Sequence, residues 1–386
     1  MRIAVFGGSF DPVHNEHLRL GEKAVESLRL DRLIVMPVSA PPHKKGKALS
    51  PDNDRLKACE IAFAHLPQAE VSDFEIKNGG VSYTYLTCRH FRSLYKDAEI
   101  FWLVGTDMLR DFPTWKNTES ILKDITLAVC ARDEKDGWIE TERAKFYEKF
   151  GKEFVVVPYN GKPVSSTKIR VLAGAGEDIS AFVPSGVEDY IKARGLYKIT
   201  GADSALALEK PSRMAHTLRV AETAAKKAVE MGLSERKAIT AALFHDCGKN
   251  ITAENPLLQD FRLREEWGEV PPSVLHQFTG AYLAENAFGV KDEDILNAAR
   301  YHTSGRAGMS ELEKLIFLAD MVEDERVYDG VDELRKLFWA KKGKGALDEC
   351  LERALKETIE YLKNKGDSVY PLTIDAYKEI SYGNYK

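Results

Sequence analysis

Residues 3–18 read IAVFGGSFDPVHNEHL, an apolar run followed by a glycine pair, a proline-containing turn and two histidines three positions apart. The apolar run predicts a buried strand, and the periodicity that begins near His14 predicts a helix. Paired glycines let backbone amides approach an anion, and a helix N-terminus adds partial positive charge. We therefore expect a strand-loop-helix phosphate site in which His14 and His17 share one helical face and reach one triphosphate. A glycine turn followed by two surface histidines is the alternative.

Further apolar runs in the first half have the length and composition of buried parallel strands. They are Leu33–Met36, Ile100–Val104, Leu127–Val129 and Phe154–Val157. Helix-like stretches separate most of them. Together with the first strand they predict an α/β domain built on a doubly wound parallel sheet.

The second half of the chain has a different pattern of apolar residues. Beyond Pro184 no comparable strand pattern remains, and residues 217–231, 238–245 and 312–322 carry helical periodicity. A chain of 386 residues is long for one core. We predict two domains, an α/β domain over 1–203 and an all-α domain over 204–386, joined in the small polar stretch near Asp203.

The overall composition excludes some functions. Fifty-five basic and 60 acidic residues give a net charge of −5, which argues against nonspecific nucleic-acid binding. The apolar run after Met1 is too short for a signal peptide or a membrane span, so we expect a cytoplasmic protein that does not bind membranes. The five scattered cysteines form no C-x-x-C pair and are expected to be reduced and buried.

Two other segments of the first half suit phosphate binding. Residues 165–170 read SSTKIR, follow a predicted strand and open a helix. Helix capping by Ser and Thr is the common explanation for such a segment, but capping does not require Arg170, whose planar fork suits an anion. Residues 41–44 read PPHK and place Lys44 in a stiff loop after the second strand.

The first half resembles the bacterial nicotinate mononucleotide adenylyltransferases. The resemblance rests on GGSFDPxHxxH, PPHK, GTDML with a following Trp, and SSTxIR, which occur here in the family's order. It implies a Rossmann-like nucleotidyltransferase fold and adenylyl transfer from ATP to nicotinate mononucleotide. The products would be nicotinic acid adenine dinucleotide and pyrophosphate, a step of NAD biosynthesis, normally with Mg²⁺. Such a transfer needs alignment and charge stabilisation but no protein nucleophile.

The same resemblance assigns residues to the site. Catalysis would involve His14, His17 and Arg170. ATP and its phosphates would be bound by Gly7, Gly8, Ser9, Phe10, Lys44, Gly105, Asp107, Ser166 and Thr167. The mononucleotide would be bound by Thr84, Trp115 and Arg132.

One position departs from the family pattern. Glu16 stands between the two histidines where the family usually has glycine. A carboxylate there repels ATP unless it points away from the phosphates. A different acceptor, of the phosphopantetheine or glycerol phosphate kind, is the rival interpretation, and Trp115 with the SSTxIR segment favours the pyridine substrate. Preference for nicotinate over nicotinamide mononucleotide stays open.

The second half contains a set of candidate metal ligands, each next to an apolar helical segment: His216, His245, Asp246, His276, His302 and Asp320. Histidine and carboxylate donors without thiolate suit iron, manganese or zinc, and six ligands suggest two ions. Two close cations activate water and hold phosphate oxygens, which points to phosphoester or phosphoanhydride hydrolysis. A structural or surface role is the alternative for any single histidine, but a buried His-Asp doublet is costly unless a metal compensates it.

This half resembles the HD-domain phosphohydrolases, named for that doublet, from about Arg213 to Arg326. The additional His276 and His302 resemble the bacterial subgroup that splits diadenosine tetraphosphate symmetrically into two ADP, a di-iron enzyme. The resemblance implies that Asp246 bridges the ions, that Lys249 and Arg306 bind or neutralise phosphate, and that Asp246 and Lys249 take part in catalysis. A solvated charge at a helix end is the alternative for Lys249.

The substrate of this half stays open. Deoxynucleotides, mononucleotides and cyclic dinucleotides are alternatives, as is a regulatory nucleotide-binding module without catalysis. The oligomeric state, including a homo-oligomer, also stays open.

Overall fold

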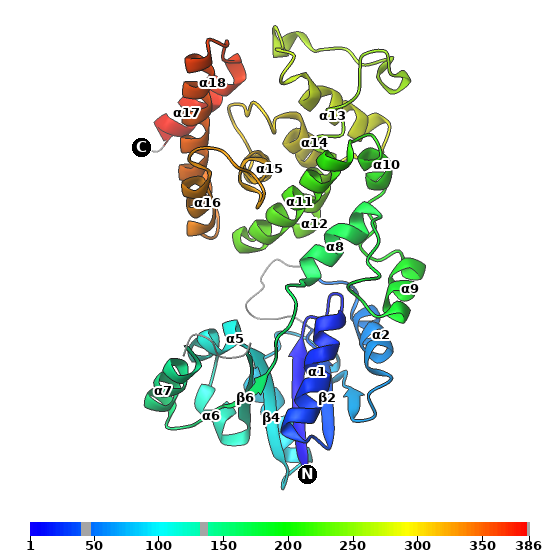
Figure 1. Ribbon diagram of the computed structural model, residues 1–386, viewed down its shortest axis with the longest axis vertical. Helices are drawn as coiled ribbons and strands as arrows, with labels where there is room; N and C mark the ends of the chain where they lie inside the picture. The colour runs from blue at the N-terminus through cyan, green and yellow to red at the C-terminus, as the bar shows by residue number, and fades with distance from the viewer. Residues whose placement is uncertain (40–47, 132–137, 384–386) are drawn as a thin grey trace. The chain divides into compact units, whose positions relative to one another are not determined.

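The computed structural model describes residues 1–39, 48–131 and 138–383 (Figure 1). By internal contacts the chain falls into two compact units. The first consists mainly of the chain up to Ile169 together with Ile179–Leu196. The second contains Arg170–Asp178 and the chain from Tyr197 onward. The predicted boundary near residue 203 stays a prediction, because the units interleave along the chain before that point.

The first unit is built on a six-stranded sheet in the order β3-β2-β1-β4-β5-β6, with every pair parallel. The strands are β1 (Arg2–Gly8), β2 (Arg32–Pro37), β3 (Ala69–Val71), β4 (Glu99–Gly105), β5 (Thr126–Ala131) and β6 (Val155–Pro158). This confirms the predicted doubly wound α/β fold. The sequence analysis missed β3, which has only three residues and none fully buried.

Helices flank this sheet and bury its apolar strands (Figure 1). The helices of the chain up to Arg194 are α1 (Asn15–Leu28), α2 (Asp52–Phe63), α3 (Phe74–Asn78), α4 (Thr84–Leu94), α5 (Thr106–Asp111), the 3₁₀ turn η1 (Phe112–Thr114), α6 (Thr118–Asp124), α7 (Trp138–Phe150), α8 (Ser166–Ala175) and α9 (Ser185–Arg194). The central strands are apolar on both sides because both faces of such a sheet are covered. Ile3 and Val5 of β1 are completely buried.

The strand order fixes where a ligand site lies. β1 pairs with β2 on one side and with β4 on the other, so the winding direction changes at β1. Loops that leave the carboxyl ends of the two strands diverge at that point and form a crevice. The GGSFDP loop leaves β1 there, and Gly105 ends β4.

The second unit is helical throughout the residues that the structure describes, as predicted. Its helices are α10 (Ala202–Leu206), α11 (Pro211–Met231), α12 (Glu235–Phe244), η2 (Pro256–Leu258), η3 (Glu265–Trp267), α13 (Leu275–Asn286), α14 (Glu293–Arg300), α15 (Glu311–Val322), α16 (Val331–Ala340), α17 (Asp348–Lys365) and α18 (Pro371–Gly383). Their shared core is rich in alanine and leucine, including Ala224, Leu243 and Leu318, and small side chains let helices approach closely.

Helix α8 contributes to both units. Its first residues belong to the first unit, and its last residues belong to the second. Val171 and Ala175 are part of the second unit's core together with Ile199. Arg170 forms an ion pair with Glu235 at the start of α12, and both side chains are more than nine-tenths buried.

No helix among the described residues combines the length and the apolar composition needed to cross a bilayer. All five cysteines are free and buried. The cytoplasmic location stays a prediction.

Candidate active sites in the two units

The loop after β1 is held in a tight conformation by its glycines. A side chain at Gly7 would approach the Trp102 ring to 3.2 Å, and one at Gly8 would approach the Phe10 ring to 3.1 Å. Phe10 itself has a positive φ of 44° and is buried. Arg55 of α2 donates to the Ser9 carbonyl at 2.8 Å, a support that the sequence analysis missed because Arg55 lies far from the loop in sequence.

His14 and His17 lie together at the start of α1, with ring centroids 3.6 Å apart and nearly parallel planes. His14 is the N-cap residue and His17 lies in the first turn of α1, so the two rings face each other at the start of the helix. The His14 backbone N–H donates to His17 Nδ1 at 3.2 Å, which places the His17 proton on Nε2. Burial lowers the pKa of His14 to about 4, so this imidazole is neutral near pH 7.

Glu16 points away from the histidines. Its carboxylate accepts hydrogen bonds from the Tyr159 hydroxyl at 2.6 Å, the Lys162 backbone N–H at 2.7 Å and the Arg19 guanidinium at 2.6 Å. Only 7% of the residue is exposed. The departure from the family's glycine therefore ties the first turn of α1 to the segment that follows β6.

The Glu16 contact gives a testable prediction about stability. Replacing Glu16 by Ala removes the acceptor of a half-buried hydroxyl and a backbone N–H, and we expect the first unit to lose about 1–3 kcal/mol of unfolding free energy. Thermal unfolding followed by circular dichroism measures the loss. Glu26→Ala on the same helix is the control, because Glu26 is largely exposed. An equal effect of the two substitutions would remove Glu16 from this role.

The contribution of Glu16 also depends on pH. Burial alone would raise the pKa of Glu16, but the hydrogen bonds from Tyr159, Lys162 and Arg19 outweigh it and hold the pKa below its ordinary value of 4.5. An acid with a lowered pKa in the folded state stabilises the protein above its unfolded-state pKa and loses that effect as the pH falls through its folded-state pKa. The stability difference between wild type and Glu16→Gln should therefore be full at pH 6 and shrink below pH 4.5.

The SSTKIR segment lies next to the glycine loop. The Ser166 hydroxyl, at the start of α8, donates to the Pro12 carbonyl at 3.1 Å. Thr167 follows Ser166 in the first turn of the same helix. Arg170, predicted to bind phosphate, pairs instead with Glu235 in this structure, and its assignment to ATP stays a prediction.

The remaining predicted transferase residues lie at helix starts or outside the described residues. Gly105 is the N-cap of α5, and a side chain there would come within 2.6 Å of the Asp107 carboxylate. Thr84 begins α4, and Trp115 follows η1. Lys116 lies 4.4 Å from the centre of the Tyr83 ring, which brings the neighbourhoods of Thr84 and Trp115 together. Lys44 and Arg132 lie outside the described residues.

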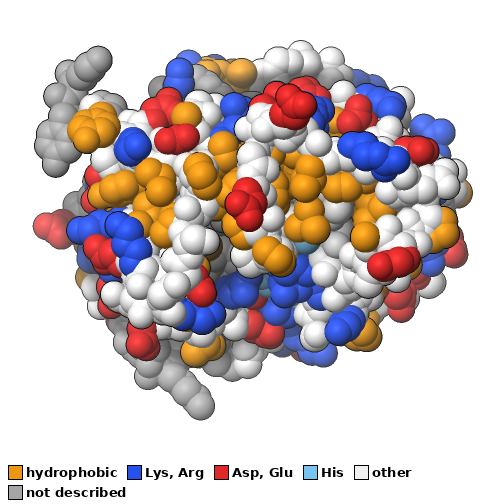
Figure 2. Space-filling model, turned by 90° about the horizontal axis from the view of Figure 1, so that it is seen from above, with side chains coloured by type: hydrophobic (Ala, Val, Ile, Leu, Met, Phe, Trp, Pro, Cys, Tyr) orange, Lys and Arg blue, Asp and Glu red, His pale blue; other side chains and the backbone are white. Residues whose placement is uncertain are grey.

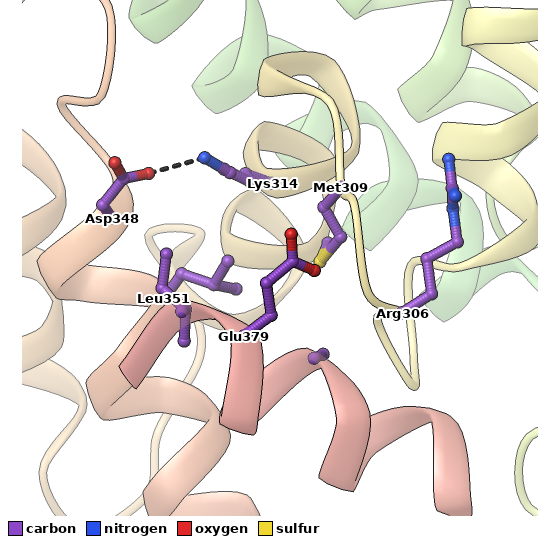
Figure 3. Close-up of a pocket in the computed structure, with 8 residues that line it drawn as sticks. Arg306, Met309, Lys314, Asp348, Leu351 and Glu379 are labelled. Atoms are coloured by element: carbon purple, nitrogen blue, oxygen red, sulfur yellow. Dashed lines mark hydrogen bonds and ion pairs between the residues drawn. The ribbon is translucent and has the colours of Figure 1, made fainter. Parts of the chain in front are cut away.

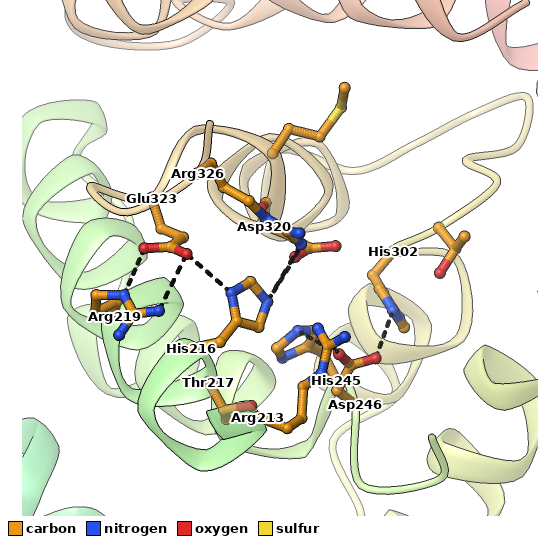
Figure 4. A network of polar contacts seen from close by, with 12 residues as sticks. Arg213, His216, Thr217, Arg219, His245, Asp246, His302, Asp320, Glu323 and Arg326 are labelled. Carbon is orange, nitrogen blue, oxygen red and sulfur yellow. Dashed lines mark hydrogen bonds and ion pairs between the residues drawn. The ribbon is translucent and has the colours of Figure 1, made fainter. Parts of the chain in front are cut away.

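All six predicted metal ligands of the second unit come together. Three overlapping groups have ligand atoms within 4.8 Å of one another. They are His216 with His245 and Asp246, His245 with His302 and Asp320, and Asp246 with His276 and His302. Figure 4 shows side chains from α11, α15 and the turns after α12 and α14 directed at one another. The His-Asp doublet lies in the turn after α12, because the helix ends at Phe244.

Backbone carbonyls orient two of the imidazoles. His245 Nδ1 lies 2.5 Å from the Ala242 carbonyl, and His302 Nδ1 lies 2.7 Å from the Ala299 carbonyl. A carbonyl accepts only, so Nδ1 carries the proton and the Nε2 lone pair faces the cluster. Burial lowers the pKa of His245 to about 4. Neutral imidazole is the form that binds metal.

A second layer of charged residues surrounds the ligands, and the sequence analysis missed it. His216 Nδ1 lies 3.0 Å from Glu323, which also accepts from Arg219 at 2.6 Å (Figure 4). Arg213 approaches Asp246 at 2.9 Å, and Arg326 pairs with Asp320. These residues had no distinguishing spacing, because charged side chains are common on helices.

The donors fit divalent cations. His245 Nε2 and Asp246 Oδ1 are buried atoms without a hydrogen-bond partner, which is costly unless another group satisfies them. Asp246 Oδ1 lies 3.4 Å from Nε2 of both His276 and His302. Imidazole and carboxylate donors suit iron, manganese or zinc.

The two predicted phosphate ligands of this half differ in position. Lys249 Nζ lies 2.8 Å from His276 Nε2 and 3.8 Å from Asp246, so it borders the ligand cluster. Arg306 instead forms a two-pronged ion pair with Glu313, at 2.8 and 2.7 Å. It lines a separate pocket of about 250 Å³, in which Figure 3 shows Lys314 paired with Asp348. Its assignment to phosphate stays a prediction.

In comparisons with known proteins, the two halves of the chain match two different families. Residues 5–172 match the Cytidylyltransferase-like family, and residues 213–324 match the HD domain family. A probable nicotinate-nucleotide adenylyltransferase/Ap4A hydrolase of Mycoplasma genitalium is 29% identical over 374 residues, covering 94% of this chain and 98% of that protein. A crystal structure titled as a predicted HD superfamily hydrolase involved in NAD metabolism, from Clostridium acetobutylicum, is 31% identical over 47% of this chain and 95% of that one, with a TM-score of 0.41.

The first half has a closer relative of matching length. A probable nicotinate-nucleotide adenylyltransferase of Clostridium tetani is 36% identical over 196 residues, which cover 50% of this chain and 98% of that protein. The chain thus belongs, through its first half, to the nicotinate-nucleotide adenylyltransferase family, and its second half contains an HD domain.

Proposed function

We propose that the first unit transfers the adenylyl group of ATP to nicotinate mononucleotide, giving nicotinic acid adenine dinucleotide and pyrophosphate. The observation that carries this proposal is the stacked His14 and His17 pair beside the glycine loop, in a chain of this family. Both imidazoles lie where a helix N-terminus and backbone amides favour an anion.

In this mechanism the protein aligns two anionic substrates. Nε2–H of His17 donates to a phosphate oxygen of ATP, and amides of the glycine loop hold its neighbours. Ser166, which bonds to Pro12, keeps the start of α8 against the loop. A magnesium ion bound with ATP would supply charge neutralisation on the triphosphate and the departing pyrophosphate. Thr84 and Trp115 are the proposed contacts of the pyridine ring.

We further propose that the second unit hydrolyses diadenosine tetraphosphate to two ADP with two divalent ions. The convergence of six imidazole and carboxylate donors carries this proposal. When bound, the ions would supply an activated water and a clamp for phosphate oxygens. His216, His245 and Asp320 would hold one side of the centre, His276 and His302 the other, and Asp246 would lie between.

Cationic residues at the same centre would bind the substrate's phosphates. Lys249 and Arg213 both approach Asp246, and Arg326 borders Asp320. In the absence of substrate these carboxylates compensate the positive charges, so no buried cation is left isolated. The same cationic side chains can also bind the oxygens of a polyphosphate.

One experiment tests both proposals. The purified protein is analysed for bound metal and incubated separately with ATP plus each pyridine mononucleotide, and with diadenosine tetraphosphate, with products identified by chromatography. We expect pyrophosphate with the dinucleotide in the first reaction and ADP alone in the second. Binding of diadenosine tetraphosphate without metal-dependent product would identify a regulatory module instead. Another acceptor used in place of the pyridine nucleotide would overturn the first proposal.

A further inference from the structure

A cleft of about 1140 Å³ opens within the second unit. Its walls come from the segment that precedes α13, the segment after α15, helix α17 and the link from α17 to α18. Drug-sized ligands occupy pockets of roughly 300–1,000 Å³, so this cleft has room for a nucleoside with space to spare. On the face seen in Figure 2, hydrophobic side chains form a band beside a group of Lys and Arg side chains, with histidine visible near them.

The cleft reaches the metal-ligand cluster. Thr303 lines it, and the Thr303 hydroxyl lies 3.0 Å from His276 Nε2. Met321 also lines it and directly follows the ligand Asp320 in α15. A substrate with its phosphates at the cluster can therefore extend its remaining part into the cleft.

Carboxylates dominate the charged lining of the cleft, whereas at the cluster cationic side chains stand beside the carboxylates. The cleft is lined by three carboxylates, Asp329, Glu357 and Asp367, against one lysine, Lys365. Arg213, Lys249 and Arg326 surround the ligand cluster. Carboxylates repel phosphate but accept hydrogen bonds from hydroxyl and amino groups. The polarity thus places phosphates at the cluster and an uncharged, donor-rich group in the cleft.

Three tyrosines in the cleft suit a flat ring. The Tyr328 hydroxyl donates to the Met321 carbonyl at 3.1 Å, and the Tyr370 hydroxyl donates to the Trp267 carbonyl at 2.5 Å, which fixes both side chains. Tyr361 is 63% exposed on α17, so most of its surface is open to a ligand. Aromatic side chains stack on nucleobases and retain affinity for any base with a π-face.

We infer that this tyrosine cleft binds a nucleoside of the substrate, with the base against Tyr361 and the ribose hydroxyls facing the carboxylates. The inference rests on the proposed hydrolase function and names the part of the substrate that the ligand cluster does not hold. It predicts that a nucleotide binds more tightly than a plain polyphosphate, because only a nucleotide fills both the cluster and the cleft.

A reporter in the cleft tests binding without turnover. All five native cysteines are buried, so Ser368→Cys, at an exposed cleft position, provides one accessible thiol for an environment-sensitive fluorophore. Adenosine is titrated into the labelled full-length protein, with ribose as the comparison. We expect a saturable change of emission with adenosine and none with ribose. Tyr361→Ala should raise the dissociation constant at least about 5-fold, the low end of base stacking.

Matched variants and a kinetic assay complete the test. Tyr361→Phe keeps the aromatic ring and should bind adenosine with the wild-type dissociation constant. Tyr147 is an exposed tyrosine of α7, and Tyr147→Ala should leave adenosine binding unchanged. Tyr361→Ala should raise KM for diadenosine tetraphosphate by a similar factor, with metal content unaltered. The absence of a saturable adenosine signal, or an unchanged dissociation constant in Tyr361→Ala, overturns the cleft inference.

The two proposals fail in different ways. If diadenosine tetraphosphate is not cleaved while adenosine binding still depends on Tyr361, the hydrolase proposal is wrong and the nucleoside cleft stands. If diadenosine tetraphosphate is cleaved with the same KM in Tyr361→Ala and wild type, the hydrolase stands and the cleft inference is wrong.

Discussion

Asp246→Asn is expected to abolish metal binding and hydrolysis by the second unit while leaving adenylyl transfer intact. Asp246 Oδ1 lies 3.4 Å from Nε2 of His276 and 3.4 Å from Nε2 of His302, and these two nitrogens are 3.2 Å apart. The amide keeps the size of the side chain but loses the negative charge that would hold two cations. A metal centre supplies several kcal/mol of transition-state stabilisation, so we expect hydrolysis to fall on the order of a thousand-fold.

Metal content by mass spectrometry and turnover of diadenosine tetraphosphate measure this effect. Asp260→Asn, an exposed aspartate of the same unit, is the control and should retain both. Removing metal from the wild type with a chelator should reproduce the Asp246→Asn rate, and adding iron or manganese should restore only the wild type. Full hydrolysis by Asp246→Asn with normal metal content would contradict the proposed centre.

His17→Ala is expected to give the second large loss, this time in adenylyl transfer. The His14 N–H fixes the His17 ring so that Nε2 carries the proton, ready to donate to a phosphate oxygen. Removing one such donor from a site of developing negative charge typically costs about 10²–10³-fold in rate. We expect kcat/KM for ATP to fall by that factor and hydrolysis of diadenosine tetraphosphate to stay at the wild-type rate.

Pyrophosphate release measured with ATP and nicotinate mononucleotide checks this prediction. His65→Ala is the matched control, because His65 is largely exposed and pairs with Glu22 away from the loop. His17→Gln, which keeps an N–H donor, should recover part of the activity lost in His17→Ala. Equal rates for His17→Ala and His65→Ala would remove His17 from the mechanism.

The fold was largely predictable because most of its strands have a recognisable sequence pattern. Strands buried on both faces, such as β1 and β4, contain an uninterrupted apolar run, Ile3–Phe6 in the first and Ile100–Val104 in the second, and that pattern needs no tertiary information. β3 escaped prediction because it is an edge strand whose three residues include the exposed Glu70. Its pairing with β2, and not its sequence, makes it a strand.

The candidate sites were predictable in part, and the chemistry of the residues explains the difference. Histidines are scarce in the second half, so the ligand set could be collected from composition and the His-Asp doublet. Glu323 and Arg213 could not be predicted in this way, because acids and arginines are common on helices. Only the fold shows that Glu323 lies beside His216 and Arg213 beside Asp246. The direction of Glu16 likewise depends on Tyr159, 143 residues away.

Helix α8 bears on how such two-enzyme chains arise and come apart. A gene cut at the polar stretch near residue 203 would look clean in sequence, yet it would take Val171 and Ala175 out of the interior of the HD half and separate Glu235 from Arg170. A free-standing HD enzyme descended from this chain would have to refill that space and neutralise that acid. Separation at that point would therefore remove part of the second unit's own core.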